Sequence, residues 1–242
     1  MGSCGRIAII LIGLLSLTPP ALAAGDLLAQ GLAAQKAGKH EQAAELLGQY
    51  LKDHPQAVEA RRTLAQALTG LEKKTEALAV VEQGLALDPQ NVPLMLSQGS
   101  LLAGLDRRGE AMAVYSKVIA LDPNNAEAFE ERGDNRAQEG SLDEALADLN
   151  KAAALAPKDA WVFNKRAMVW LCQGDYKKAV EDFSTAVKVG PDLPHAYFFR
   201  GNVYHHHLNQ PNKAIADYKE ACRLGHPLSC RELEKMGVKP EK

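Results

Sequence analysis

The sequence predicts an all-α protein built from about six stacked pairs of helices, and two observations carry that prediction. Alanine and leucine, both strong helix formers, are the commonest residues, with 38 and 33 copies among 242, while aromatic residues make up only 5%. The second observation is a 34-residue period in the positions of proline, alanine and glycine. Because 46% of the residues are hydrophobic, the composition also argues against a disordered chain.

The period is clearest in the prolines and extends to three other series of positions. Five prolines recur 34 residues apart: Pro55, Pro89, Pro123, Pro157 and Pro191. The same interval separates small residues (Gly31, Ala65, Gly99, Gly133, Ala167, Gly201), alanines (Ala43, Ala77, Ala111, Ala145, Ala179) and bulky residues (Leu47, Val81, Tyr115, Leu149, Phe183). Internal repeats of this length indicate a protein assembled from stacked structural units.

Each unit is predicted to contain two helices. In the fifth unit, apolar residues recur at helical spacing over 159–173 and again over 176–189, with Gly174-Asp175 between them. We interpret the small residue of each unit as the point where its two helices approach closely, and the bulky residue as the side chain that fills the space beside it. The proline after the second helix prevents its continuation. The predicted units are 24–57, 58–91, 92–125, 126–159, 160–193 and 194–226, followed by a short capping helix and tail over 227–242.

The repeated positions resemble the signature of tetratricopeptide repeat proteins. The sixth unit contains Tyr197-x-x-Arg200-Gly201-x-x-Tyr204, and the fifth continues as Ala179-x3-Phe183-x2-Ala186-x4-Pro191. The resemblance covers about residues 24–226 and implies a right-handed α-α superhelix, a tetratricopeptide solenoid with a concave groove lined by the first helix of every repeat. It also implies a protein-protein interaction scaffold or adaptor that binds a partner peptide or helix in that groove.

Carried over onto this sequence, the lining positions of the last three repeats form the candidate partner-binding groove. They are Glu127, Glu130, Glu131 and Asp134, then Trp161, Asn164, Lys165, Met168 and Leu171, then His195, Phe198, Phe199, Asn202 and His205. Both tryptophans and four of the five phenylalanines fall between residues 161 and 199, which places the working surface there. The carboxylates repel one another, so a basic peptide segment is an expected partner. The aromatic and methionine side chains beside them make an apolar segment the other expected partner. Packing of Trp161 and Phe198 in the core is the alternative.

The first 23 residues have the pattern of a secretory signal peptide. Arg6 precedes an apolar run over 7–17, two prolines follow, and Ala21-Leu22-Ala23 places small residues two apart. We expect cleavage after Ala23 and an exported protein, periplasmic or secreted, acting in the cell envelope. An uncleaved membrane anchor is the alternative, although the apolar run is shorter than the roughly 20 residues of a membrane span. No other segment is apolar enough to cross a membrane.

Three cysteines remain after the expected cleavage. The spacing of Cys222 and Cys230 resembles the cysteine-bridged helical pairs of Sel1-like repeat proteins, which implies a disulfide in an oxidising compartment. Two reduced, half-buried thiols are the alternative. Cys172 has no evident partner and is expected to pack as a small hydrophobic residue near the groove.

Neither catalysis nor nucleic-acid binding is expected. The charge is nearly balanced, with 28 basic and 30 acidic residues, whereas nucleic-acid-binding proteins show a basic excess. The sequence contains no glycine-rich phosphate loop, nucleophile elbow or His-Glu-x-x-His pair. We therefore predict a protein that is not an enzyme and needs no cofactor.

The cluster His205, His206 and His207 is the one candidate for a metal site. Successive residues of a helix point about 100° apart, so three adjacent histidines cannot all bind one ion while helical. We expect solvent-exposed histidines and no metal, with a metal-binding envelope protein as an alternative function. A structural protein that self-associates is the other alternative. The sixth repeat also has one extra residue here, which predicts an altered last hairpin.

Overall fold

The computed structural model describes residues 24–239. The predicted signal peptide, residues 1–23, and the last three residues of the predicted tail lie outside this range. Within it, the chain forms thirteen α-helices, one π-helical turn and no strand, which confirms the all-α prediction. Of these helices, none has the length and apolar character needed to span a membrane.

The helices pair along the chain into hairpins. The first five pairs are α1 (Ala24–Lys36) with α2 (His40–Asp53), α3 (Val58–Gly70) with α4 (Lys74–Leu87), α5 (Val92–Gly104) with α6 (Arg108–Leu121), α7 (Ala126–Gln138) with α8 (Leu142–Leu155), and α9 (Ala160–Cys172) with α10 (Tyr176–Val189). The sixth is α11 (Pro194–Asn202), continued by the π-helical turn η1 (Val203–His207), with α12 (Pro211–Arg223), and α13 (Pro227–Lys235) follows it.

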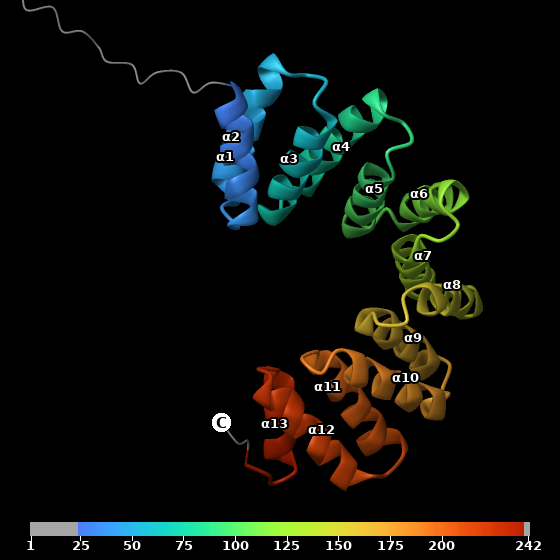
Figure 1. The fold of residues 1–242 in the computed structure, drawn as a ribbon. Coiled ribbons are helices and arrows are strands. Elements are labelled where there is room, and N and C mark those ends of the chain that lie inside the picture. The colour runs from blue at the N-terminus through green and yellow to red at the C-terminus, as the bar shows by residue number, and fades with distance from the viewer. Residues whose placement is uncertain (1–23, 240–242) are drawn as a thin grey trace, which may run out of the picture.

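The pairs stack side by side into an arc, as expected for an α-α superhelix (Figure 1). From α3 to α12, the odd-numbered helices form the inner row of the arc and the even-numbered helices its outer row. Within the inner row α1 contacts α3, α5 contacts α7, and α7 contacts α9. Each repeat therefore packs mainly on its neighbours, and the first helices of successive repeats line one continuous concave face.

Each hairpin closes where a small residue of its first helix meets a bulky residue of its second. A Cβ atom placed on Gly31 would lie 2.8 Å from Cγ of Leu47, and one placed on Gly99 would lie 2.5 Å from Cε1 of Tyr115. The same contact recurs between Gly133 and Leu149 and between Gly201 and Tyr218. These distances leave no room for a methyl group and confirm the predicted role of the periodic small residues.

The turn inside each hairpin places one residue in the left-handed region. These residues are Gly38, Glu72, Asp106, Gly140, Gly174 and Asn209, with φ between 51° and 83°. In the second repeat, the N–H of Lys73 donates to the carbonyl of Leu68 at 2.9 Å and that of Glu72 to the carbonyl of Thr69 at 3.0 Å. This is the Schellman pattern, which satisfies the last carbonyls of the first helix and reverses the chain.

The extra residue of the sixth repeat is accommodated by the π-helical turn. The N–H of Leu208 donates at 3.1 Å to the carbonyl of Val203, five residues back instead of the four of an α-helix. The close contact between Gly201 and Tyr218 is nevertheless formed as in the other repeats. The insertion thus changes the end of the first helix and leaves the packing of the hairpin intact.

Helix α13 covers the end of the stack. Leu233 is fully buried and packs with Ala214 and Tyr218 of α12. Cys222 and Cys230 form a disulfide that joins α12 to α13, with their Cα atoms 5.0 Å apart. The apolar side chains of the last hairpin are therefore shielded from solvent by a helix that is also covalently tethered.

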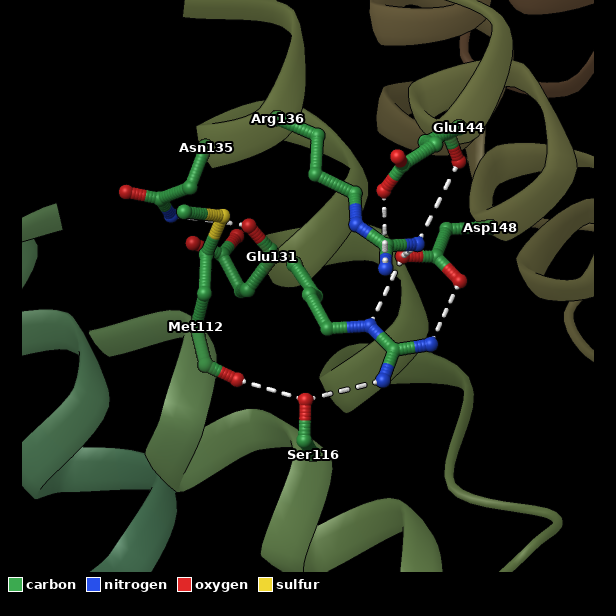
Figure 2. Close-up of polar contacts among 8 residues, drawn as sticks. Met112, Ser116, Glu131, Asn135, Arg136, Glu144 and Asp148 are labelled. Carbon is green, nitrogen blue, oxygen red and sulfur yellow. Dashed lines mark hydrogen bonds and ion pairs between the residues drawn. The ribbon is translucent and has the colours of Figure 1, made fainter. Parts of the chain in front are cut away.

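A half-buried arginine, paired with a buried aspartate, joins three helices in each of repeats four to six. Arg132 of α7 donates to both carboxylate oxygens of Asp148 on α8, at 2.8 and 2.7 Å, and to Oγ of Ser116 on α6 at 2.9 Å. Arg136 donates to the same Asp148 at 2.7 Å (Figure 2). The arrangement recurs in Arg166 with Asp182 and Asn150, and in Arg200 with Asp217 and Ser184. We call this series the arginine ladder; because each arginine reaches the preceding repeat, it links the repeats as well as closing each hairpin.

Candidate functional site

The inner face of the arc contains two neighbouring hollows. The first, the α3–α5 hollow, has a volume of about 650 Å³. It is lined by Arg62, Ala65, Gln66, Thr69, Lys74, Pro93, Leu96, Ser97, Ser100, Leu101, Gly104 and Glu127. It lies outside the predicted site, because the lining residues of the second and third repeats form no acidic or aromatic patch in the sequence. The signal was nevertheless present: Ser97, Ser100 and Gly104 lie on one face of α5, and such short side chains leave space beside a helix.

The second, the α7–α9 hollow, brings together five of the predicted groove residues. It has a volume of about 630 Å³ and is lined by Ala126, Glu127, Glu130, Glu131, Asp159, Trp161 and Lys165. Glu127 lines both hollows, so together they form one groove along α3, α5, α7 and α9. Trp161 is 49% exposed, the most exposed large hydrophobic side chain of the described chain, and its ring centroid lies 6.0 Å from that of the exposed His195.

Lys165 pairs with two of the acidic residues and changes the expected electrostatics of this hollow. Its Nζ lies 2.9 Å from Oε1 of Glu130 and 2.6 Å from Oε1 of Glu131. The chain itself therefore supplies a cation that relieves part of the repulsion that we expected a partner to relieve. The carboxylate of Glu127 forms no hydrogen bond or ion pair with the residues that the structure describes.

The carboxyl groups around Lys165 have perturbed acidities. Desolvation raises the pKa of Glu127, and the neighbouring Glu131 raises it further. Burial also raises the pKa of Glu130 and of Asp134, an effect that Lys165 opposes in both cases. Burial acts to lower the pKa of Lys165, but Glu131 and Glu130 outweigh it, so the amine stays protonated. This part of the groove is a partly dehydrated acidic surface with one internal cation.

Several other predicted groove residues are engaged in packing. Phe198 packs with Tyr218 and lies against the ring of His226, with centroids 4.4 Å apart, and Phe199 packs against the core around Phe183. Met168 and Leu171 pack against the same core as Phe199. Phe198 and Phe199 are both half-buried between helices, which is the packing given above as the alternative for Phe198, and a binding role for either stays a prediction. Aromatic enrichment over residues 161–199 thus reflects core packing more than surface.

Three polar residues of the predicted set occupy different environments. Asn164 is 6% exposed, and its Oδ1 has no hydrogen-bond partner. Asn202 accepts a hydrogen bond from the hydroxyl of Tyr218 at 2.8 Å. Asp134 is half-buried and accepts a hydrogen bond from Gln138 at 2.9 Å. Of these three, Asn164 is the one whose side-chain oxygen is buried without a hydrogen-bond partner among the described residues.

The histidine cluster does not converge on a common point. The rings of His205 and His206 are stacked with centroids 4.5 Å apart, whereas His207 stacks on Tyr176 of α10 at 4.1 Å. Across residues 24–239, no three His, Cys, Asp or Glu side chains are grouped as metal ligands would be. The geometry therefore gives the metal-binding alternative no support. Cys172 also departs from expectation, since it is exposed rather than packed as a small apolar residue.

Comparisons with known proteins agree on the architecture. The family model described as tetratricopeptide repeat matches residues 28–92, 96–160 and 166–226. PilF of Pseudomonas aeruginosa is a similar solved structure, with a TM-score of 0.73 and 19% identity over 88% of this chain and 97% of PilF. A tetratricopeptide protein of Thermus thermophilus has a TM-score of 0.63 and 22% identity over 76% of this chain and all of its own.

A third similar structure is described by its binding site. YrrB, a tetratricopeptide protein with an unusual peptide-binding site, has a TM-score of 0.57 and 18% identity over 80% of this chain and 100% of its own. These identities are low, so the three structures establish a common fold. No curated protein sequence matches the chain.

Proposed function

This chain belongs to the tetratricopeptide repeat family, and we propose that it is a protein-protein interaction scaffold, not an enzyme, that binds a partner segment in its inner groove. The family is one of scaffolds that in general bind other proteins or peptides. The observation that carries the proposal is the continuity of the two hollows along α3, α5, α7 and α9, joined at Glu127. A solvent-open groove of this length suits an extended or helical segment better than a small molecule.

The groove is preformed, which favours binding. Its floor consists of helices held by the close contacts of Gly99 and Gly133 with the second helices of their hairpins. Little chain entropy is therefore lost from this protein when a partner segment docks. The likeness to YrrB, which is described as having a peptide-binding site, supports the same use of the fold here.

The place of action in this proposal is the cell envelope, reached by export. The predicted signal peptide over 1–23 supports it, and so does the Cys222–Cys230 disulfide, because such bonds persist in oxidising compartments. Fractionation of the native host followed by N-terminal sequencing tests it, with a mature chain starting at Ala24 in the periplasmic or secreted fraction as the expected result. Recovery of a chain that begins at Met1 in the membrane fraction would instead establish the uncleaved anchor.

Photo-crosslinking in the native host tests the groove. A photoreactive amino acid is placed at Trp161 for the α7–α9 hollow and at Ser97 for the α3–α5 hollow. The control position is Glu181, which is exposed on the outer-row helix α10. We expect both groove positions to crosslink the same protein and the control to crosslink it much less. Equal crosslinking from all three positions would contradict the proposal, and crosslinks to a second copy of this chain would identify the self-associating alternative.

A further inference from the structure

The α7–α9 hollow contains more acidic groups than its single lysine can neutralise. Four carboxylates line it, from Glu127, Glu130, Glu131 and Asp159, against the ammonium of Lys165. Lys165 forms ion pairs with Glu130 and Glu131. Asp159 caps α9, since its carboxylate accepts the N–H of Trp161 at 2.9 Å. The carboxylate of Glu127 is left without a hydrogen bond or ion pair among the described residues. The hollow therefore keeps a net negative charge that nothing within it balances.

Two buried side chains near these carboxylates contain polar atoms without a hydrogen-bond partner among the described residues, although neither residue lines the hollow. The hydroxyl of Tyr115 is fully buried without a partner, and the charges acting on it come from Glu131, Glu127 and Asp134. The Oδ1 atom of Asn164, the residue next to Lys165, is also buried without a partner. The carboxylates that line the hollow accept hydrogen bonds only. A complementary group must therefore donate hydrogen bonds and carry positive charge.

Trp161 supplies the remaining surface for such a group. Its ring is about half exposed at the edge of the same hollow. An indole face attracts a cation, and a planar guanidinium can stack on it while bonding a carboxylate with two N–H groups. The α3–α5 hollow is lined by Arg62 and Lys74, each ion-paired outside the hollow, against the one carboxylate of Glu127, so it lacks the acidic excess of the α7–α9 hollow and is the less favourable place for a cation.

Resting on the proposed function, we infer that the α7–α9 hollow binds a basic side chain of the partner segment, preferably arginine, between the carboxylates of Glu127 and Glu131 and against the face of Trp161. The neighbouring Lys165 holds Glu130 and Glu131 in place, and the arriving cation takes the acceptor capacity that Lys165 leaves open. The occupant is thus a basic stretch of a protein partner, and the charge of one residue sets its register along the groove.

A peptide-display selection tests this on the purified, disulfide-intact protein. A random 12-residue library is panned on the wild type, and each recovered peptide is tested again on Trp161→Ala and on Ser97→Trp, which remove or fill a groove surface. We expect groove-dependent peptides to share an arginine or lysine at one position. Calorimetry then compares a synthetic peptide with its citrulline version, which keeps the shape of arginine without its charge. The citrulline peptide is expected to bind at least about 10-fold more weakly.

Variants of the protein separate the electrostatic contact from folding. Glu127→Gln with Glu131→Gln should weaken the basic peptide about 10-fold and reduce the salt dependence of its affinity. The matched control, Glu41→Gln with Glu181→Gln, removes two exposed carboxylates outside the hollow and should change neither. The single substitution Glu127→Lys, at an exposed position, provides the same test if the double variant is poorly folded, and it should abolish binding of the basic peptide.

Each outcome of the selection decides between two conclusions. Groove-dependent peptides that lack a basic residue, or equal affinity for the citrulline version, would overturn this inference and leave the proposed function standing. Recovery of no peptide whose binding depends on Trp161 or Ser97 would contradict the proposed function itself, and this inference with it.

Discussion

Two tyrosines occupy equivalent places in the third and sixth repeats and differ in one hydrogen bond. Tyr115 packs on Gly99 and Tyr218 on Gly201, both rings fully buried. The hydroxyl of Tyr218 donates to Asn202 at 2.8 Å, whereas that of Tyr115 has no partner. A buried hydroxyl loses its hydration in either case, so only Tyr218 recovers that loss within the folded chain.

Removing the two hydroxyls should therefore have opposite effects on stability. We expect Tyr115→Phe to leave the free energy of unfolding unchanged or to raise it by up to about 1 kcal/mol, and Tyr218→Phe to lower it by about 1 kcal/mol. Urea unfolding followed by circular dichroism measures both. An equal loss in the two variants would show that Tyr115 has a hydrogen bond in solution.

Glycines of the inner and outer helices make a second matched comparison. A Cβ on Gly99 would lie 2.5 Å from the stiff ring of Tyr115, while one on Gly48 in α2 would meet nothing within 4 Å. We expect Gly99→Ala to destabilise the protein by roughly 1–3 kcal/mol through overpacking, and Gly48→Ala to stabilise it by roughly 0.5–1 kcal/mol through helix propensity. Thermal unfolding shows whether each variant is more or less stable than the wild type. Stabilisation by both substitutions would mean that the helices of the third hairpin move apart to admit the methyl group without loss of stability.

At the scale of the helices, the hairpin turns use the left-handed conformation whether or not glycine is present. Gly140 and Gly174 adopt it without strain, but Glu72 and Asp106 occupy the same place with φ of 59° and 64°. This conformation costs a residue with a Cβ about 1–2 kcal/mol. The Schellman hydrogen bonds and the packing of both helices hold these two residues in it.

Glycine at such a turn should relieve that strain. We expect Glu72→Gly to raise the free energy of unfolding by about 0.5–1 kcal/mol, since part of the relief is lost to the greater freedom of glycine in the unfolded chain. Among residues 24–239, the one ion pair of Glu72 is with Lys74 at 3.7 Å, and it contributes little because it is long and exposed. The reciprocal change Gly140→Ala should lower stability by a similar amount. Denaturant unfolding measures the stability of both variants. A lower free energy of unfolding for Glu72→Gly would contradict the proposal that the left-handed conformation strains Glu72.

The start of α13 depends on a neutral histidine. Nδ1 of His226 accepts the backbone N–H of Ser229 at 3.3 Å, and the ring lies 5.2 Å from that of His195. Burial lowers the pKa of His226, and the nearby His195 lowers it further. A protonated imidazole carries hydrogens on both nitrogens and cannot accept this N–H, so the cap requires the neutral form.

The stability of the molecule should consequently fall as the solution is acidified. With its pKa lowered in the folded state, His226 binds a proton more readily in the unfolded chain, so stability is complete above the unfolded pKa of about 6.5 and is lost as pH falls through it towards the folded value. We expect His226→Asn, which caps a helix at any pH, to lose less stability than the wild type between about pH 7.5 and pH 5.5. Thermal unfolding at a series of pH values measures this, and parallel curves for the two proteins would exclude the mechanism.

Across the whole molecule, the two halves of the arc are joined differently. The arginine ladder runs through the last three repeats, whereas the equivalent positions hold Leu64 and Val80 in the second repeat and Gln98 and Val114 in the third. In the middle of the ladder, Arg166 and Asp182 are both largely buried and joined at 2.6 Å. A buried ion pair is costly to break by removing one partner and much less costly to replace as a pair.

Breaking the ladder should unfold the second half of the arc before the first. We expect Arg166→Met to lower stability by about 3–5 kcal/mol, and the double variant Arg166→Met with Asp182→Leu to recover most of that loss. Hydrogen exchange should show the lost protection over α8–α12 and little change in α1–α5, because repeats transmit stability mainly to their neighbours. A uniform loss of protection would indicate that the arc unfolds as one unit.

How far the sequence predicted the candidate site depended on what kind of contact was involved. The resemblance to tetratricopeptide repeats predicts one shared surface for five of the lining residues, Glu127, Glu130, Glu131, Trp161 and Lys165, because it assigns them to groove positions of neighbouring repeats. Their pairing was not predicted, because the reach of Lys165 across to α7 depends on the angle between adjacent repeats. The α3–α5 hollow was not predicted, because the short side chains on one face of α5 show only that space can open there, and the size of that space depends on the packing of the neighbouring helices.

The sequence by itself determined the all-α architecture, the repeat length and the close-contact positions, because each of these follows from local periodicity and the size of single side chains. Only the tertiary structure decided which aromatic residues are exposed, which carboxylates are paired and where the groove is hollow. Phe198 and Trp161 illustrate the difference: both lie at groove positions of their repeats, yet one packs against α12 and the other faces solvent. The exposure of a side chain at such a position depends on how closely the neighbouring repeat packs against it, and the stacking of the repeats determines that packing.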